Sequence, residues 1–300
     1  MSSPQGDLGQ PAQTATTPPE SAVRIGLASG RSIACTVAGA GPALFLLHGI
    51  GGARAQWAPQ IAALGTANTV IAWDARGYGD SDGPPVNRFS DFADDLFALM
   101  DRLAIEQAVA VGHSMGGRIL LEACAHQPNR FAGLVLSGTQ PAYLMHMTAA
   151  ERADYIGQRR TLFDGERVRP EKVAAIVNGL LHPQASAQAK ATMTKSLSGL
   201  RRDGYLAALE ASATMDRRSV LSTLAMPVRV LGGDTDAVCP VAVTQDLAHA
   251  IGQGPATILP KVGHMPNLEA PEAFSAVVTD LLAALPKPAD TPDRPHPNAP

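Results

Sequence analysis

The sequence predicts a protein of the α/β class, with a mostly parallel central sheet flanked by helices and a helical lid inserted after the sixth strand. Short, wholly apolar runs alternate with segments of helical periodicity, which is typical of parallel sheets. The alternation then stops for roughly 75 residues that show only helical patterns. Hydrophobic residues make up 45% of the 300-residue chain, which is enough to bury a sizeable core.

The first part of the chain predicts a hairpin and two buried strands. Residues 23–37 suit a β-hairpin that turns at Ser29–Gly30–Arg31. Residues 43–47 and 69–73 are short apolar runs, as expected for strands that are buried on both faces. Residues 53–64, which lie between these two strands, suit a helix.

Two more helices and two more strands follow. Residues 92–103 have helical spacing, because their large apolar side chains fall on one face. Those side chains are Phe92, Leu96, Leu99, Met100 and Leu103. Residues 108–111 and 132–136 predict further buried strands, and residues 118–126 between them predict a helix.

The alternation breaks at Gly138–Thr139–Gln140–Pro141, and strands resume only with residues 228–231 and 256–259. Residues 271–285 predict the closing helix. Sheets of this class bind ligands at the carboxyl ends of their strands. We therefore expect the helical segment between the two groups of strands to form a lid over that edge.

These patterns divide the chain into a core, a lid and two tails. Residues 21–139 and 219–285 are expected to form one α/β core, with residues 140–218 as the lid. Residues 1–20 are polar and rich in Pro, Gln and Thr, which predicts disorder. Residues 286–300 carry six prolines and are expected to be flexible as well.

Composition and charge exclude several classes of function. A net charge of −3 and a pI of about 6.2 argue against a nucleic-acid partner. No apolar run approaches the roughly 20 residues of a membrane helix, and the N-terminus lacks the pattern of a secretory signal. The three scattered cysteines suggest reduced thiols in a cytoplasmic protein, without a disulfide framework or a metal site.

The stretch with the strongest chemical signal is Gly-x-Ser-x-Gly, formed by Gly112, Ser114 and Gly116. It lies between a predicted buried strand and a predicted helix. A serine on such a turn is held exposed in a strained conformation, and the turn brings backbone segments so close that side chains at the two glycines would clash. The following helix directs its free N–H groups at the serine. Ser114 is therefore the predicted nucleophile.

A serine nucleophile needs a base, and the base needs a third group that orients it. The candidate base is His264, which follows the last predicted strand. Asp234 and Asp236, which follow the preceding strand, compete as the orienting group. All of these residues come after strands, so they are expected at the same edge of the sheet as Ser114.

Two backbone N–H groups are needed to stabilise the oxyanion of an acyl transfer. One is expected from Met115, directly after the nucleophile, and the other from Ile50. Gly49 and Gly51 flank Ile50 and allow the backbone to approach a substrate. Gly51 is the alternative donor.

Other polar residues are interpreted as structural. His48 is expected to shape its turn, and His113 is the variable residue of the Gly-x-Ser-x-Gly stretch. Asp74 and Arg76 are interpreted as a turn-stabilising pair, and Cys239 as a small buried residue.

Four stretches together resemble the α/β-hydrolase fold family: residues 48–52, 74–81, 112–117, and 233–240 with 263–274. The resemblance covers residues 23–285. It implies Ser114 as nucleophile, His264 as base and Asp236 as the orienting group, since the spacing from Asp236 to Pro240 matches the family pattern. Similar members are 3-oxoadipate enol-lactonases, meta-cleavage-product C–C hydrolases and small carboxylesterases, which implies a role in aromatic catabolism.

Some motifs depart from particular members of that family. Dehalogenases and epoxide hydrolases of this fold use an aspartate nucleophile, where this chain has Ser114. Typical meta-cleavage hydrolases carry Gly-Pro-Gly after His-Gly and a tryptophan after the histidine base. This chain has Gly51–Gly52–Ala53 and Met265 at those places. The departures favour ester or lactone hydrolysis over C–C cleavage.

The charge of the predicted lid bears on the substrate. Residues 141–220 hold 12 Lys and Arg against 8 Asp and Glu, a net of +4. Such pairs as Arg159–Arg160 are typical of a solvated helical surface, and the alternative is attraction of an anionic substrate. Arg118 is a candidate carboxylate partner or a surface residue. Tyr143 and His146 are candidate substrate contacts at the start of the lid, although core packing explains them equally well.

We predict a serine hydrolase that cleaves a small, carboxylate-bearing ester or lactone through an acyl-enzyme. It needs no metal and no organic cofactor, and neither a nucleic acid nor a membrane is a predicted partner. C–C bond hydrolysis of a meta-cleavage-type keto acid is the first alternative. A low-turnover ligand receptor and a cofactor-free oxygenase on the same fold are the others. The sequence makes no prediction of oligomeric state.

Overall fold

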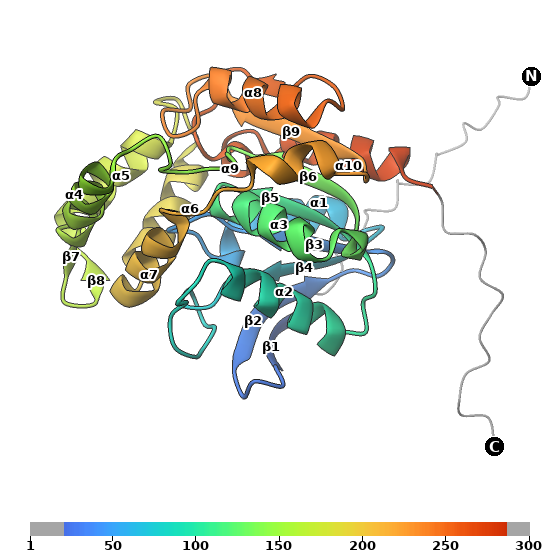
Figure 1. The fold of residues 1–300 in the computed structure, drawn as a ribbon, viewed down its shortest axis with the longest axis horizontal. Coiled ribbons are helices and arrows are strands. Elements are labelled where there is room, and N and C mark those ends of the chain that lie inside the picture. The colour runs from blue at the N-terminus through green and yellow to red at the C-terminus, as the bar shows by residue number, and fades with distance from the viewer. Residues whose placement is uncertain (1–20, 287–300) are drawn as a thin grey trace, which may run out of the picture.

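The computed structural model describes residues 21–286. They form an eight-stranded sheet in the order β1-β2-β4-β3-β5-β6-β9-β10, with helices on both faces (Figure 1). The first two strand pairs, β1 with β2 and β2 with β4, are antiparallel. All other pairs are parallel. The predicted α/β class with a mostly parallel sheet is confirmed.

The strands lie close to the predicted positions. Their bounds are Ser21–Gly26 (β1), Ser32–Ala38 (β2), Ala43–Leu47 (β3), Thr69–Trp73 (β4), Ala108–His113 (β5), Phe131–Ser137 (β6), Val228–Gly233 (β9) and Thr257–Leu259 (β10). The apolar runs are indeed buried on both faces. In β3, Leu44 and Leu46 pack into one core cluster, whereas Phe45 and Leu47 pack into the other.

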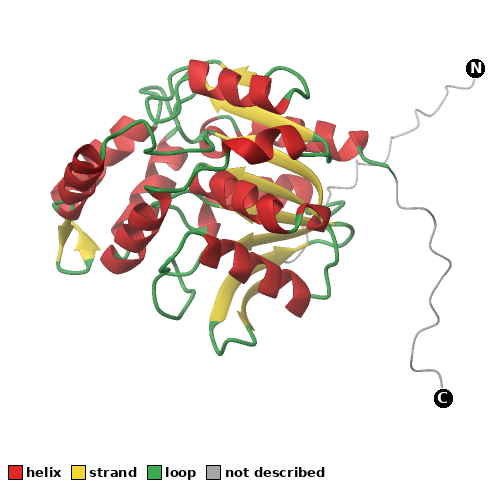
Figure 2. Ribbon diagram, viewed as in Figure 1, coloured by secondary structure: helices red, strands yellow, loops and turns green. Residues whose placement is uncertain are grey.

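Helices cover the two faces of the sheet unequally (Figure 2). One face is packed by α1 (Ala58–Leu64) and α10 (Pro271–Ala284). Trp57, which ends the 3-10 turn directly before α1, packs against Phe274 of α10. The other face is packed by α2 (Ser90–Arg102), α3 (Met115–His126) and α8 (Val241–Ile251). A short helix α9 (Pro266–Glu269) precedes α10.

Helix α8 was not predicted. It begins after Pro240 and ends at Gly252, which has a φ of +75° and stops the helix in the left-handed region. A proline before a helix and a glycine after it are common end signals. Together with the helical spacing of the buried residues Leu247, Ala248 and Ile251, they were the available signal for this helix.

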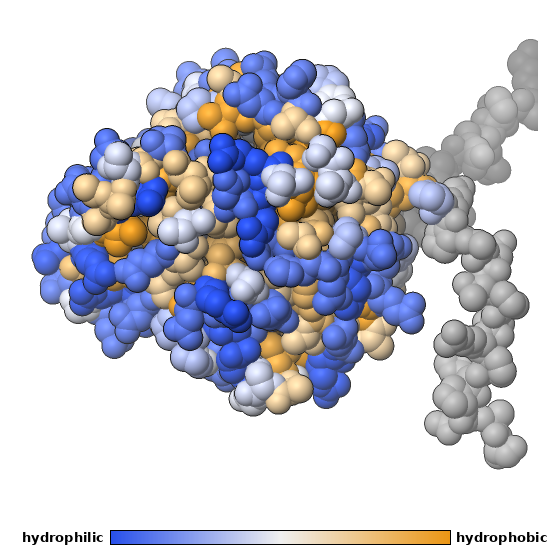
Figure 3. Space-filling model, in the orientation of Figure 1, coloured by the Kyte–Doolittle hydropathy of each residue, from blue (hydrophilic) through white to orange (hydrophobic). Residues whose placement is uncertain are grey.

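The insert after the sixth strand contains α4 (Ala149–Arg160), α5 (Pro170–Leu180), α6 (Ala187–Ser198) and α7 (Arg202–Ser212). A capping box between Thr148 and Glu151 begins α4. The prediction of purely helical structure was wrong in one place, because Phe163–Asp164 (β7) and Arg167–Val168 (β8) form a small antiparallel hairpin. Two-residue strands are too short to produce a recognisable alternation. In the view of Figure 3, the surface of the insert is mostly hydrophilic.

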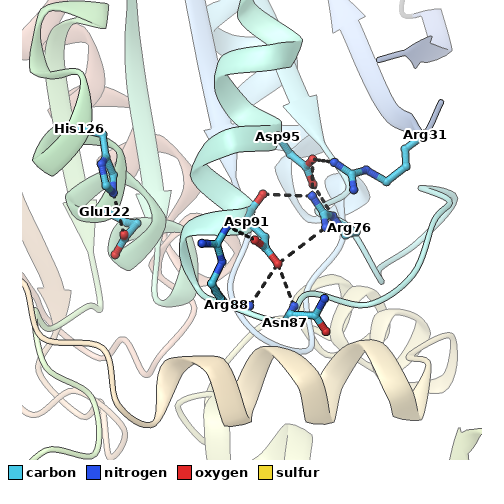
Figure 4. Close-up of polar contacts among 8 residues, drawn as sticks. All are labelled: Arg31, Arg76, Asn87, Arg88, Asp91, Asp95, Glu122 and His126. Atoms are coloured by element: carbon cyan, nitrogen blue, oxygen red, sulfur yellow. Dashed lines mark hydrogen bonds and ion pairs between the residues drawn. The ribbon is translucent and has the colours of Figure 1, made fainter. Parts of the chain in front are cut away.

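The interpretation of Asp74 and Arg76 as one pair was wrong. Buried Asp74 accepts hydrogen bonds from the backbone and guanidinium of Arg54 and from the Asp80 amide. Arg76 instead forms two hydrogen bonds, of 2.6 and 2.7 Å, with Asp95 on α2 (Figure 4). Each residue thus stabilises the loop after β4 separately, through a partner that is distant in sequence.

The predicted tails, residues 1–20 and 286–300, lie outside the described residues apart from Pro286. Across residues 21–286, none of the helices is long and apolar enough to cross a membrane.

Candidate active site

Four parallel strands end at one edge of the sheet, and His48 and the three predicted catalytic residues lie in the loops that follow them. Strand β3 ends before His48, β5 before Ser114, β9 before Asp236, and β10 before His264. The carboxyl ends of neighbouring parallel strands lie side by side, so these residues converge although 216 positions separate the first from the last.

Ser114 occupies a strained turn between β5 and α3. Its φ is +52° and its ψ is −111°, outside the regions that L-residues favour. Such a conformation costs on the order of 1–3 kcal/mol and persists where the surroundings enforce it. The Ser114 amide donates to the Ser137 carbonyl at 2.8 Å, and the Ser114 carbonyl accepts from the Thr139 hydroxyl at 2.7 Å.

The predicted need for glycine on either side of Ser114 is confirmed. A Cβ atom at Gly112 would lie 2.5 Å from the amide nitrogen of Gly117, and one at Gly116 would lie 2.1 Å from the carbonyl oxygen of Leu47. Both contacts are with backbone atoms, which cannot rotate away. The turn can therefore form only if both positions lack a side chain.

His264 and Asp236 form a buried pair. The Nδ1 atom of His264 lies 2.8 Å from Oδ2 of Asp236, and the Asp236 Oδ1 atom accepts from the amides of Val238 and Cys239, each at 2.8 Å. Asp236 is buried, whereas Asp234 is exposed and accepts from the Val262 amide. With the carboxylate on Nδ1, the Nε2 atom of His264 is left to act on a proton.

The loop that carries His264 is fastened to the insert. The His264 amide donates to the Leu180 carbonyl at 2.6 Å. The carboxylate of Glu269 accepts from the amides of Gly263, Met265 and His182 at 3.1, 3.0 and 2.7 Å. The position of His264 therefore depends on α5 of the insert as well as on the core.

His48 orders the loop after β3, as predicted. Its Nε2 atom accepts from the Ala75 amide at 3.0 Å, so the proton is on Nδ1, which donates to the Gly49 carbonyl at 2.8 Å. Burial lowers the pKa of His48 and keeps it neutral. The Gly49 carbonyl also accepts from the Gly52 amide at 2.9 Å. Because a trans peptide points its C=O and N–H in opposite directions, the Ile50 N–H points away from both donors.

The two predicted oxyanion donors remain available. Within residues 21–286, neither the Ile50 amide nor the Met115 amide donates a hydrogen bond. Met115 is the first residue of α3, where helix geometry leaves the N–H unpaired. Ile50 lines the cavity described next, while the Met115 side chain is buried below it.

A cavity of about 440 Å³ lies over Ser114 and His264. This volume is in the range of small-molecule sites. Of the 26 residues that line the cavity, 15 belong to the insert, and two of these, Phe163 and Val168, come from the hairpin of β7 and β8. The shape of the cavity is therefore determined mainly by the insert.

The lining of this cavity is positively charged. It includes Arg118, Arg159 and Lys172 but no aspartate or glutamate among the described residues. Arg118 is 2% exposed, which decides between the two predicted interpretations against a surface position. Its guanidinium lies 4.2 Å from the centre of the Tyr143 ring.

Most predicted substrate contacts line the cavity, but one does not. Gly49, Gly51, Arg118 and Tyr143 line it. His146 is exposed and lies among residues of a separate surface hollow, so the structure does not bring it together with the other predicted contacts.

Sequence reasoning missed His113. This side chain lies beside His264, with 4.8 Å between the ring centres, and lines the cavity. Burial, followed by the nearby charge of His264, lowers the pKa of His113 well below its ordinary value. The His113 imidazole is therefore uncharged at neutral pH. Its position directly before Ser114 was the available signal.

Tyr155, which lines the cavity from α4, and Glu269, which holds the His264 loop from α9, were also missed. Arg159 was considered only as one of the paired charges of the lid, and it lines the cavity as well. No group of three or more His, Cys, Asp or Glu side chains in the described part of the chain is arranged to hold a metal ion.

A family sequence model described as alpha/beta hydrolase fold matches residues 42–271. Among characterised sequences, 3-oxoadipate enol-lactonase 2 of Acinetobacter baylyi is 29% identical over 250 residues, covering 80% of this chain and 88% of that protein. The 2-(acetamidomethylene)succinate hydrolase of Mesorhizobium japonicum is 27% identical, covering 82% and 90%. A solved thermophilic esterase of Thermogutta terrifontis, with malate bound, is 25% identical with a TM-score of 0.78, covering 88% and 98%.

Proposed function

The chain belongs to the α/β-hydrolase fold family and is a hydrolase, and from this premise we propose that it cleaves a small carboxylic ester or lactone through an acyl-enzyme on Ser114. The observation that carries the proposal is the buried His264–Asp236 pair at the same sheet edge as the strained Ser114. An imidazole oriented by a carboxylate is the arrangement that activates a serine hydroxyl.

In the first half of the reaction, the Ser114 oxygen attacks the substrate carbonyl while its proton passes to Nε2 of His264. Asp236 stabilises the imidazolium that results. The amides of Ile50 and Met115 hold the oxyanion of the tetrahedral intermediate. When this intermediate collapses, the bond to the alcohol breaks and His264 returns the proton to the departing oxygen.

In the second half, His264 removes a proton from water, and the hydroxide attacks the acyl-serine. The same two amides hold the second oxyanion. Collapse releases the carboxylic acid, and the proton on His264 restores the Ser114 hydroxyl. In a lactone the departing oxygen remains attached to the acyl group, so a single hydroxy acid leaves.

We also propose that the substrate carries a carboxylate. The support is the cavity lining, which has three cations and no anion among the described residues. In a partly desolvated cavity such a lining attracts anions. Two of the relatives are named for substrates with carboxylates, 3-oxoadipate enol-lactone and 2-(acetamidomethylene)succinate.

Residues 140–218 act as the lid in this proposal. They supply most of the cavity lining and contact the loop of His264 through Leu180 and His182. The core of residues 21–139 and 219–285 carries the three reacting side chains. A lid that excludes water strengthens the electrostatic contacts beneath it.

The test is the intact mass of the protein after reaction with a fluorophosphonate probe. We expect one adduct on the parent and none on Ser114→Ala. Asp236→Asn should slow the labelling and the hydrolysis of 4-nitrophenyl acetate by about 10³-fold or more, because a misoriented His264 no longer accepts the proton.

Asp234→Asn is the matched control, because it makes the same change two residues away at an exposed carboxylate. Its rate should stay within about threefold of the parent rate. An adduct on Ser114→Ala, or an equal loss in Asp234→Asn and Asp236→Asn, would contradict the proposal.

A further inference from the structure

Arg118 is a buried cation without an acidic partner among residues 21–286. It lies in α3, and its amide donates to the Ser114 carbonyl at 3.2 Å. Its Nε and Nη2 atoms are buried and form no hydrogen bond, and none of the ion pairs among residues 21–286 includes it. Burial lowers the pKa of Arg118, yet the guanidinium remains charged at neutral pH because the ordinary pKa of arginine lies far above 7.

The other fully buried arginine of the described residues, Arg76, is paired, and so is the half-buried Arg217. Arg76 binds Asp95 through two hydrogen bonds, and Arg217 binds Glu122 at 2.8 Å. Arginine is almost never buried without such a partner, because an uncompensated charge in the interior is unfavourable. Arg118 departs from this pattern at a place where a ligand can enter, since it lines the cavity over Ser114.

Aromatic rings hold the Arg118 side chain in place. The guanidinium stacks on Tyr143, whose hydroxyl is 2.8 Å from that of Tyr155. Arg159 stacks on Tyr155 in turn, 4.1 Å from the ring centre. A guanidinium that stacks through its face keeps its edge free, and the N–H groups of that edge match the two oxygens of a carboxylate.

We infer that Arg118 is the specificity-determining residue of this cavity and binds a carboxylate of the substrate through two N–H groups. The inference rests on the proposed function, because it places the bound group relative to Ser114. Arg118 lies one turn of α3 beyond Ser114, and both residues line the same cavity of about 440 Å³. The substrate is therefore a small molecule whose carboxylate is a few bonds from the carbonyl that Ser114 attacks.

Two matched pairs of substrates test this inference. The first pair is 4-nitrophenyl hydrogen glutarate and 4-nitrophenyl pentanoate, which differ by a carboxylate in the acyl part. The second is 4-carboxyphenyl acetate and phenyl acetate, which differ by a carboxylate in the alcohol part. For each pair the measured quantity is kcat/KM of the charged substrate divided by kcat/KM of the neutral one.

We expect this ratio to exceed one in the parent for at least one pair, and to fall by about 10–100-fold in Arg118→Met. That range is what the loss of one charge-assisted contact produces. Arg118→Lys should fall between the two, because it keeps the charge and loses the two-pronged geometry. A ratio in Arg118→Met within twofold of the parent ratio for both pairs would overturn the inference and leave Arg118 as a stacking partner of Tyr143.

Lys172→Met is the control for charge. Lys172 lines the same cavity and is exposed, so water and salt screen it. In Lys172→Met, the ratio of kcat/KM for the charged and neutral substrates should differ from the parent ratio by less than about threefold, and this difference should shrink in 0.5 M salt. An equal effect of Lys172→Met and Arg118→Met would mean that the general field selects the substrate, and would overturn the specific role of Arg118.

Binding of glutarate, measured by calorimetry on the parent and on Arg118→Met, separates this inference from the proposed function, because no turnover is needed. Glutarate should bind the parent at least tenfold more tightly than Arg118→Met. Equal binding, or no binding to the parent, would overturn the role of Arg118 even if Ser114 reacts with the fluorophosphonate. Tight binding to an unreactive parent would support Arg118 and contradict the proposed function.

Discussion

His113 and Arg118 are the two titratable residues whose role depends most on where the fold puts them. Both lie within four residues of Ser114, and both are buried against the cavity. His113 is neutral because burial and the neighbouring His264 oppose a second charge. Arg118 stays charged because no environment of this kind deprotonates a guanidinium. The cavity therefore presents one permanent buried cation next to the proposed proton acceptor.

The lowered pKa of His113 predicts a loss of stability in acid. In the unfolded chain this histidine binds a proton below its ordinary pKa of about 6.5, whereas in the folded protein it stays neutral. The unfolded state then binds more protons, so the free energy of unfolding falls as the pH drops below 6.5, by up to about 1.4 kcal/mol per pH unit for each such proton. His48, whose pKa is also lowered by burial, acts in the same direction.

The measurement is urea unfolding between pH 8 and pH 5. The pH dependence should be weaker in His113→Gln than in the parent, whatever the absolute stability of the variant. His249→Gln changes an exposed histidine on α8 and should leave the dependence as it is. Parallel curves for the parent and His113→Gln would exclude His113 as a source of the acid lability.

At the scale of elements, close packing and hydrogen bonds hold the insert against the loops of the core. Gly77 after β4 packs against Gly204 at the start of α7, where a Cβ on Gly204 would lie 2.0 Å from the Gly77 carbonyl oxygen. Arg201 donates to the carbonyls of Gly77, Tyr78 and Ser81 next to this contact. On α6, the Ser196 hydroxyl donates to the Gly51 carbonyl at 3.0 Å. The loops of the proposed oxyanion site and base therefore both have insert residues as supports.

The Glu269 carboxylate accepts hydrogen bonds from three backbone amides of the insert and the His264 loop. We therefore expect a substitution of Glu269 to slow the reaction. Glu269→Ala removes the acceptor for three amides around His264, so the loop should lose its fixed position. We expect the rate of Ser114 labelling by the fluorophosphonate, and kcat for 4-nitrophenyl acetate, to fall by about tenfold or more, with a smaller change in KM. Stability should fall by about 2–4 kcal/mol, since bonds to a charged acceptor are lost.

Glu272→Ala is the control, because Glu272 is an exposed carboxylate in the first turn of α10. Glu269→Gln keeps one acceptor oxygen and should recover part of the rate. If Glu269→Ala lowered stability and left both the labelling rate and kcat at the parent level, Glu269 would be a structural residue without influence on His264.

At the scale of the whole molecule, positive and negative residues are distributed unevenly along the chain. Residues 141–220 carry +4, which leaves −7 for the rest of the chain, and the cavity between them is lined by cations. An overall charge of −3 therefore conceals a positive site. The segregation places the attraction for an anion where Ser114 lies and keeps the remaining surface acidic.

The three cysteines predict how the whole molecule responds to a thiol reagent. Cys35, Cys124 and Cys239 are free and buried, and burial raises the pKa of each thiol to about 12. A thiol that is protonated and enclosed does not attack a disulfide reagent. At pH 8 the folded protein should therefore react negligibly with dithionitrobenzoate within minutes, and should release three equivalents of chromophore in guanidinium chloride. Rapid reaction of one equivalent with the folded protein would show that a cysteine is accessible.

Local pattern was sufficient for much of this protein. Apolar runs predicted the positions of the strands. The geometry of the turn around Ser114 predicted the need for glycine at Gly112 and Gly116. These two features depend on neighbours within a few positions, which the sequence shows directly. The choice of Ser114, Asp236 and His264 as the reacting residues came from the family resemblance, and it stays a prediction. In that resemblance, the spacing from Asp236 to Pro240 selected Asp236 over Asp234.

Tertiary structure decided what depends on distant partners. Contacts between residues far apart in the chain bury Arg118 without a counter-ion and bring His113 against His264. Such contacts also give Asp74 and Arg76 their separate partners. The strands β7 and β8 are too short to show an alternation of apolar and polar residues. Only the folded structure shows that Phe163 and Val168 of this hairpin line the cavity. Sequence periodicity records which face of an element is apolar, whereas the charge and shape of a site are set by elements that meet only after the chain has folded.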